Sequence, residues 1–117
     1  MKARVFKIEE VMWEEPPEHY SAFSKLLVNP KSVGSKHFDF RISSYQPKGY
    51  CSCHAHQVQE QIYYVLQGKG IMEMDDLKKV VDPHTVIHIP PGVRHAIYNT
   101  GLEDLVFFVI TSPPEDK

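Results

Sequence analysis

Residues 49–70 read GYCSCHAHQVQEQIYYVLQGKG, and this stretch decides how the chain folds. Its second half contains a β-branched and aromatic run, residues 62–66, which Gly68 and Gly70 close. Such a run between turn residues predicts a β-strand. Its first half carries His54 and His56, two residues apart. Because side chains at positions i and i+2 of a strand point to the same face, the two imidazoles are expected to converge.

Outward from this stretch, short strand-like segments alternate with turn residues. In residues 38–43 apolar and polar residues alternate, which predicts a strand with its apolar side buried and with Asp39 and Arg41 on an exposed face. Asp75-Asp76 predicts a hairpin turn between two further strands. The remaining strands are expected at residues 25–28, 71–74, 77–81, 86–89, 95–98 and 105–111. So many short strands favour a sandwich or a barrel, since only these architectures hide their edges.

Helical signals are confined to the N-terminal part of the chain. Residues 8–13 have the most helical pattern and run into Pro16-Pro17, which ends it. Residues 18–24 are expected to add a short turn of helix. The fold class predicted from these patterns is all-β.

Composition excludes several kinds of partner. The 117 residues are about one domain long, and the net charge of only -2 gives no strong field for binding nucleic acid or an anionic membrane. The first ten residues lack the apolar core of a signal peptide, and no run reaches the 18 apolar residues of a membrane span. Cys51 and Cys53 would lie about 6.5 Å apart along a strand, too far for a mutual disulfide. We therefore expect a cytoplasmic protein.

The two histidines need further donors if they are to hold a metal ion. Glu60 or Gln61 lies at the start of the next strand, and either face of that strand is apolar enough to be buried, so strand parity leaves the choice open. His95 follows the rigid turn at residues 90–92 and is the obvious distant donor. Along a strand, the two nearby cysteines would point away from the histidines, which argues against a mixed Cys/His site.

At this point the sequence resembles a known family, the cupins. Their first motif is a glycine, a His-x-His pair, an acidic residue and a second glycine. Their second motif is a glycine, then Pro-x-Gly, a histidine and an asparagine. The matching residues here are Gly49, His54, His56, Glu60 or Gln61, and Gly68 for the first motif, and Pro90, Gly92, His95 and Asn99 for the second. The resemblance covers residues 38–113. It departs where the second motif should open with glycine: His84 stands there, at a turn where a positive φ is expected.

The resemblance implies a cupin-type double-stranded β-helix, or jelly-roll barrel, with one metal ion inside its mouth, and commonly a homodimer. Residues 38–117 would form the barrel, and residues 1–37 would add strands and a short helix packed on it. The six-residue spacing to Gly68 favours Gln61 over Glu60, so the expected metal ligands are His54, His56, Gln61 and His95. Such nitrogen and oxygen donors suit a divalent Mn, Fe, Ni, Co or Zn ion.

Two classes of function fit this site. The first is a metalloenzyme, an isomerase, lyase, decarboxylase or dioxygenase, that acts on a small anionic (carboxylate or enolic) or sugar-derived substrate. Four neutral donors would leave the ion at +2 in a low-dielectric barrel, which favours an anionic, chelating ligand. Tyr63 and His88, if inward, would hydrogen-bond the ligand or move its proton. The alternative is a non-enzymatic, metal-dependent sensor or carrier of a small ligand, which turnover of a small carboxylate would exclude.

A homodimer is also expected from the strand at residues 62–66. Residues 62, 64 and 66 form one apolar face, and residues 63 and 65 form the other. One barrel interior covers only one of these faces, so a second sheet, the N-terminal segment or a partner subunit must cover the rest.

Overall fold

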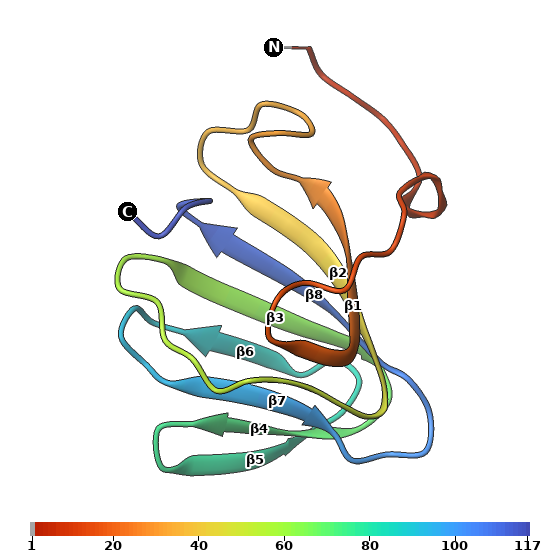
Figure 1. Cartoon of the computed structure of the whole chain (residues 1–117), viewed down its shortest axis with the longest axis vertical. Coiled ribbons are helices and arrows are strands. Elements are labelled where there is room, and N and C mark those ends of the chain that lie inside the picture. Colours follow the sequence, from red (N-terminus) through yellow and green to blue (C-terminus); the bar gives the residue numbers. More distant parts are fainter. Residues whose placement is uncertain (1) are drawn as a thin grey trace.

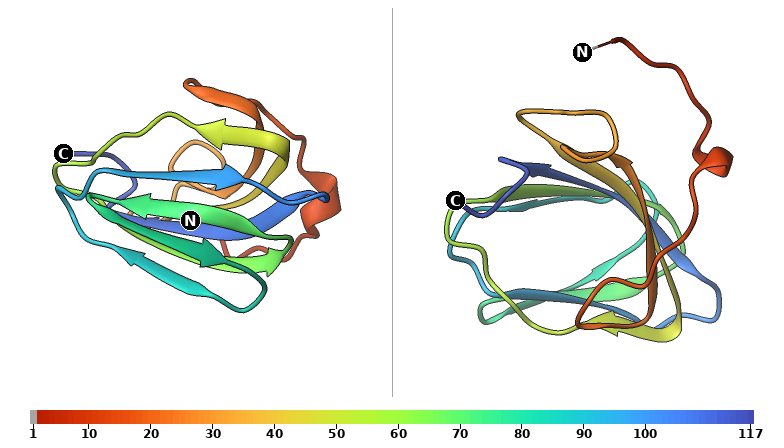
Figure 2. Two further views of the ribbon diagram at one scale, coloured as in Figure 1. Left: turned by 90° about the horizontal axis from the view of Figure 1, so that it is seen from below. Right: turned by 45° about the horizontal axis from the view of Figure 1, so that its top comes forward.

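The computed structural model of the protein describes residues 2–117. Within this range the chain forms one curled antiparallel sheet of eight strands, in the order β5-β4-β7-β2-β8-β3-β6, with β1 paired to β2 (Figure 1). The strands are β1 (His19–Val28), β2 (Asp39–Cys51), β3 (Glu60–Gln67), β4 (Gly70–Met74), β5 (Leu77–Val81), β6 (Val86–Ile89), β7 (His95–Asn99) and β8 (Leu105–Ser112). Figure 2 shows the sheet wrapping around an interior. Among the described residues, no helix is long and apolar enough to cross a membrane.

Alternation along β3 fixes which side chains enter the barrel. Gln61, Tyr63 and Val65 are buried, whereas the apolar side chains at the positions between them lie on the outer surface. The inward set joins an apolar core that includes Met72, Phe107 and residues from most of the strands. The parity that the sequence left open is thereby decided, with Gln61 inside and the neighbouring glutamate outside.

Strand β2 has the opposite orientation to the one its sequence pattern predicted. Asp39 and Arg41, expected on an exposed face, line the interior, while Phe40 lies on the outer face and packs against Phe108 of β8 with ring centroids 5.2 Å apart. The usual rule of apolar side chains inward fails here because Asp39 and Arg41 satisfy each other's charge, and because the outer face is itself an apolar layer.

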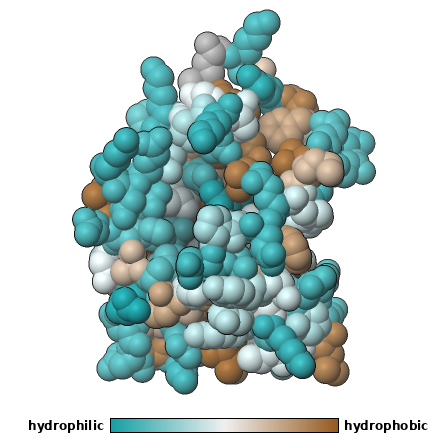
Figure 3. Space-filling model, in the orientation of Figure 1, coloured by the Kyte–Doolittle hydropathy of each residue, from teal (hydrophilic) through white to brown (hydrophobic). Residues whose placement is uncertain are grey.

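The N-terminal part contains less helix than expected. A 3-10 turn at Ile8–Glu10 replaces the predicted helix, and residues 18–24, expected to be a turn of helix, belong largely to β1. Pairing with β2 gives the residues of β1 backbone hydrogen bonds to a neighbouring strand, whereas a helix of this length would be only marginally stable. The segment before β1 crosses the outside of the barrel (Figure 2), and the face drawn in Figure 3 is largely hydrophilic, with hydrophobic patches among the polar surface.

Two turns next to the motif residues impose backbone constraints. Gly68 has φ +88°, and a Cβ atom there would lie 2.5 Å from the carbonyl oxygen of Asp104, so only glycine fits. His84 has φ +68°, the positive value expected at the position where the second motif departs from glycine. The hydroxyl of Tyr64 lies 2.9 Å from Nδ1 of His84.

Candidate metal centre

Three histidines meet at one end of the barrel interior. His54 and His56 lie in the loop after β2 rather than on a strand, and His95 begins β7. Two backbone hydrogen bonds join His54 to His95, from each amide to the other's carbonyl oxygen at 3.0 and 2.8 Å, and the amide of Gly92 donates to the carbonyl oxygen of His56 at 2.7 Å. These bonds tie together loops about 40 residues apart in the sequence, so that the ligand atoms of the three histidines lie within 4.8 Å of one another.

Backbone contacts orient the imidazoles toward a shared point. The Nδ1 atom of His54 lies 2.8 Å from the carbonyl oxygen of Ser52, and that of His95 lies 2.9 Å from the carbonyl oxygen of Val93. A carbonyl oxygen can only accept, so both Nδ1 atoms carry the proton and both Nε2 atoms keep a free lone pair. This is how proteins commonly orient histidine ligands of a metal ion.

A hydrogen bond to a side chain orients Gln61. Its Nε2 donates to the hydroxyl of Thr111 at 3.0 Å, which leaves its Oε1 as an available acceptor. Among the described residues, three buried side-chain nitrogen or oxygen atoms lack any hydrogen-bond partner: His56 Nε2, His95 Nε2 and Gln61 Oε1. His56 shares the ligand cluster with His95 and the cavity wall with Gln61. Buried polar atoms are almost always paired, so these unpaired atoms call for a bound species.

Burial favours the metal-binding, neutral form of His56 and His95. Desolvation lowers the pKa of His95 to about 4, despite the opposing hydrogen bond to Val93. Desolvation likewise lowers the pKa of His56, with the nearby His54 acting in the same direction. An imidazole must be neutral to coordinate a metal, so the lowered pKa values of His56 and His95 favour the metal-binding form of these two residues at neutral pH.

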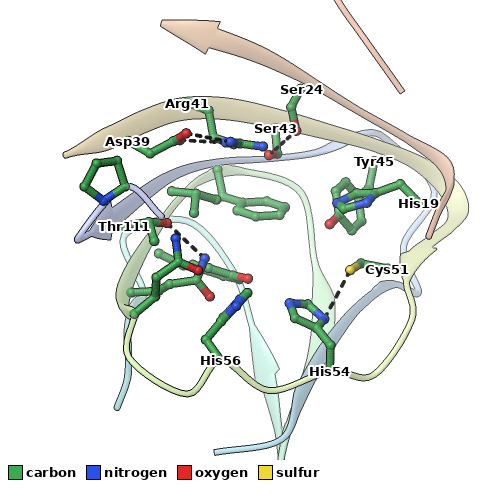
Figure 4. A pocket seen from close by; sticks show the side chains of 16 residues that line it. His19, Ser24, Asp39, Arg41, Ser43, Tyr45, Cys51, His54, His56 and Thr111 are labelled. Atoms are coloured by element: carbon green, nitrogen blue, oxygen red, sulfur yellow. Dashed lines mark hydrogen bonds and ion pairs between the residues drawn. The ribbon is translucent and has the colours of Figure 1, made fainter. Parts of the chain in front are cut away.

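His54 and His56 open onto a cavity of about 170 Å³ (Figure 4). Its wall carries more polar groups than the sequence pattern suggested. The lining residues are His19, Ser24, Asp39, Arg41, Ser43, Tyr45, Cys51, His54, His56, Gln59, Gln61, Tyr63, Phe107, Val109, Thr111 and Pro114.

Two expectations about the cavity wall require correction. His88 lies on the outer surface, where its Nε2 contacts the carboxylate of Glu60, because Val86 and His88 occupy the outward positions of β6. Cys51 was expected to point away from the histidines, but it lines the cavity with its Sγ 3.6 Å from Nδ1 of His54. The strand ends at Cys51, so the alternation used to orient it does not continue to His54.

Tyr63, the other candidate for interaction with a ligand, does face inward. Its ring stacks on Phe107 with centroids 5.2 Å apart and meets the ring of His95 edge-on. Burial raises the pKa of Tyr63 far above its usual value, so the hydroxyl keeps its proton. Its chemistry within the cavity is therefore that of a hydrogen-bond donor.

His19 also lines the cavity, although sequence reasoning did not select it. It begins β1, and its Nδ1 lies 2.8 Å from the carbonyl oxygen of Pro17, so its Nε2 is the free acceptor. Desolvation lowers its pKa. No spacing rule connects residue 19 to the motif histidines, and the pairing of β1 with β2 is what brings it near them.

Comparison with known proteins agrees with this geometry. Residues 41–111, more than half of the chain, match the cupin domain family. The chain belongs to the cupin family. It is 33% identical over 93 residues to glucose-6-phosphate isomerase of Thermococcus gammatolerans, covering 75% of this chain and 44% of that protein. It is 30% identical over 93 residues to auxin-binding protein 1 of Arabidopsis thaliana, covering 72% and 46% of the two chains.

Solved structures share the fold of most of the chain. The crystal structure of a predicted oxalate decarboxylase from Thermotoga maritima superposes with a TM-score of 0.84 at 22% identity, covering 93% of this chain and 98% of that one. The double-stranded β-helix inferred from the motifs is therefore confirmed. This cupin spans about half the length of the curated relatives that it matches.

Proposed function

We propose that this cupin binds one divalent transition-metal ion through His54, His56, His95 and Gln61, and acts on a small anionic or sugar-derived molecule in the adjoining cavity. The observation that carries the proposal is the set of three buried, unpartnered lone-pair atoms, two on histidines and one on Gln61. All four donors are neutral nitrogen or oxygen atoms, a set that suits Mn, Fe, Ni, Co or Zn. When bound, the ion supplies Lewis-acid or redox chemistry at this end of the cavity.

The protein's own residues would hold and orient the ligand. Tyr63 keeps its proton and would donate a hydrogen bond to a ligand oxygen. His19, neutral and with a free Nε2, would accept a proton or a hydrogen bond from the ligand. Similarity to a glucose-6-phosphate isomerase over 75% of this chain supports the sugar-derived class of substrate. A cytoplasmic location and a barrel beginning at residue 38 remain predictions.

Elemental analysis of the purified protein tests the metal proposal. We expect about one transition-metal ion per chain, and an increase in melting temperature when the stripped protein receives Mn, Fe, Ni, Co or Zn. A protein that is purified without metal and is not stabilised by any of these ions contradicts the proposal. Turnover of small carboxylates or sugar phosphates by the loaded protein would identify an enzyme. Tight binding of such a molecule without turnover would instead favour a sensor or carrier.

A further inference from the structure

A second polar feature lies in the cavity, on the wall formed by β2. The Arg41 guanidinium is held by the Asp39 carboxylate through two hydrogen bonds, Nε to Oδ1 at 2.8 Å and Nη2 to Oδ2 at 2.7 Å. Figure 4 shows this pair across the cavity from His54 and His56. A guanidinium carries five N–H donors, and Asp39 uses two of them. Within residues 2–117 Arg41 has no other hydrogen-bond partner, so three donors remain for a molecule in the cavity.

Asp39 acts as a positioning residue for these donors. Its side chain is 10% exposed and that of Arg41 is 27% exposed, so the pair is largely withdrawn from bulk water. Two parallel hydrogen bonds fix the plane of the guanidinium, and the edge that carries Nη1 is left without a partner. A rigid guanidinium fork is the group best suited to a planar carboxylate, because it binds both oxygens together.

The charges in the cavity indicate what such a fork would bind. Asp39 and Arg41 cancel each other, and the imidazoles and Gln61 are neutral when they hold a metal. A divalent ion would therefore leave the cavity at +2. Uncompensated charge is costly in the low-dielectric interior of a barrel, and a ligand with two negative charges would balance it.

We propose that the ligand of this cavity is a small dicarboxylate, with one end at the histidines and Gln61 and the other carboxylate bound by Arg41. The histidine end of this inference rests on the proposed metal site, whereas the Arg41 end does not. A cavity of about 170 Å³ is close to the roughly 150 Å³ that holds benzene, and it suits a ligand whose two acidic groups are only a few carbon atoms apart. Arg41 thus determines the specificity for a dianion over a monoanion.

Calorimetric titration of the metal-loaded protein tests this assignment. The probe is malate, whose hydroxy-acid end can chelate, and the matched probe is its 4-amide, which has the same shape with one charge fewer. Wild-type protein should bind malate at least about tenfold more tightly than the amide, because a charge-assisted contact to Arg41 is lost in the amide. In the double variant D39N/R41Q this preference should disappear while metal affinity is unchanged.

The double variant is preferable to a single one because it leaves no buried charge unpaired. Arg41→Lys is the second variant: it keeps the charge but loses the fork, and its preference for malate should be intermediate. Equal affinity for the two probes in wild-type protein, binding of neither, or a preference that survives in D39N/R41Q would each overturn the proposal.

The metal and the arginine can be tested separately. If wild-type protein binds no metal, the proposed function fails, and Arg41 is then tested in metal-free protein with succinate against its monoamide. A preference for succinate that Arg41→Lys reduces supports the arginine site on its own. No preference in the metal-free protein would overturn it.

Discussion

Gln61 and Glu60 are neighbours in the sequence, but they lie on opposite sides of the barrel wall. Gln61 is buried with its Oε1 free and its Nε2 held by Thr111, whereas Glu60 is exposed and contacts His88. Gln61→Ala should therefore weaken metal binding by at least about tenfold, since a ligand is removed, and Glu60→Ala should have little effect. Metal titration monitored by calorimetry measures both. The opposite ranking of the two variants would refute Gln61 as the fourth donor.

The buried histidines make the stability of the metal-free protein depend on pH. The pKa of His95 is about 4 in the folded protein and about 6.5 in an unfolded chain, so the unfolded chain takes up the proton first as the pH falls. The contribution of His95 to the free energy of unfolding should thus be constant well above pH 6.5 and decrease between pH 6.5 and 4, by up to about 3 kcal/mol. The lowered pKa of His56 adds a loss of the same sign.

Urea unfolding in the presence of a chelator, at several pH values between 7.5 and 4.5, measures this effect. His95→Gln should flatten the pH dependence, and His37→Gln, at an exposed position, should leave it unchanged. An equally steep dependence in His95→Gln would show that other groups cause it.

At the scale of elements, the strands and both motif loops could be predicted from sequence, whereas the cavity wall could not. The period-2 pattern located β2 and β3, but it assigned Asp39 and Arg41 to the outside because it assumes that the apolar face is buried. The barrel has apolar residues on its outer face as well, so polarity alone does not define the interior. Cys51 and His19 enter the cavity through the end of a strand and through pairing with β1, which local spacing does not encode.

The turn before β6 provides a test of backbone strain. His84 has a positive φ, which costs a residue with a Cβ atom about 1 kcal/mol, partly offset here by the contact with Tyr64. His84→Gly should leave stability unchanged or raise it by up to about 1 kcal/mol. His84→Val should lower it by about 1–2 kcal/mol, because a β-branched residue tolerates this conformation poorly. Thermal unfolding of the two variants gives the comparison, and a Val variant as stable as the Gly variant would contradict the strain argument.

At the scale of the whole molecule, one outer face of the barrel is apolar across four adjacent strands. The registers place Phe40 of β2, Ile110 of β8 and Ile62 of β3 in one row, and Ile42, Phe108 and Tyr64 in the next. Val86 of β6 pairs with Tyr64 and extends the second row. Ile62 is 41% exposed and Val86 is 63% exposed, so the interior does not account for this layer. An apolar surface of this kind on a single chain is typical of a surface that binds another protein.

We propose that two copies of this cupin associate through that face as a homodimer. A two-fold arrangement sets the same surface of each copy against the other, and the central strands β8 and β3 would lie at the middle of the contact.

Light scattering at micromolar concentration should therefore give about twice the 13.5 kDa of one chain. Val86→Glu should shift the mass toward that of one chain, because it places a charge in the apolar contact. Val80→Glu is the matched control, since Val80 is similarly exposed at 65% but lies on the edge strand β5 at the other end of the sheet. A wild-type mass of one chain would rule out the dimer, and equal dissociation by both variants would place the contact elsewhere.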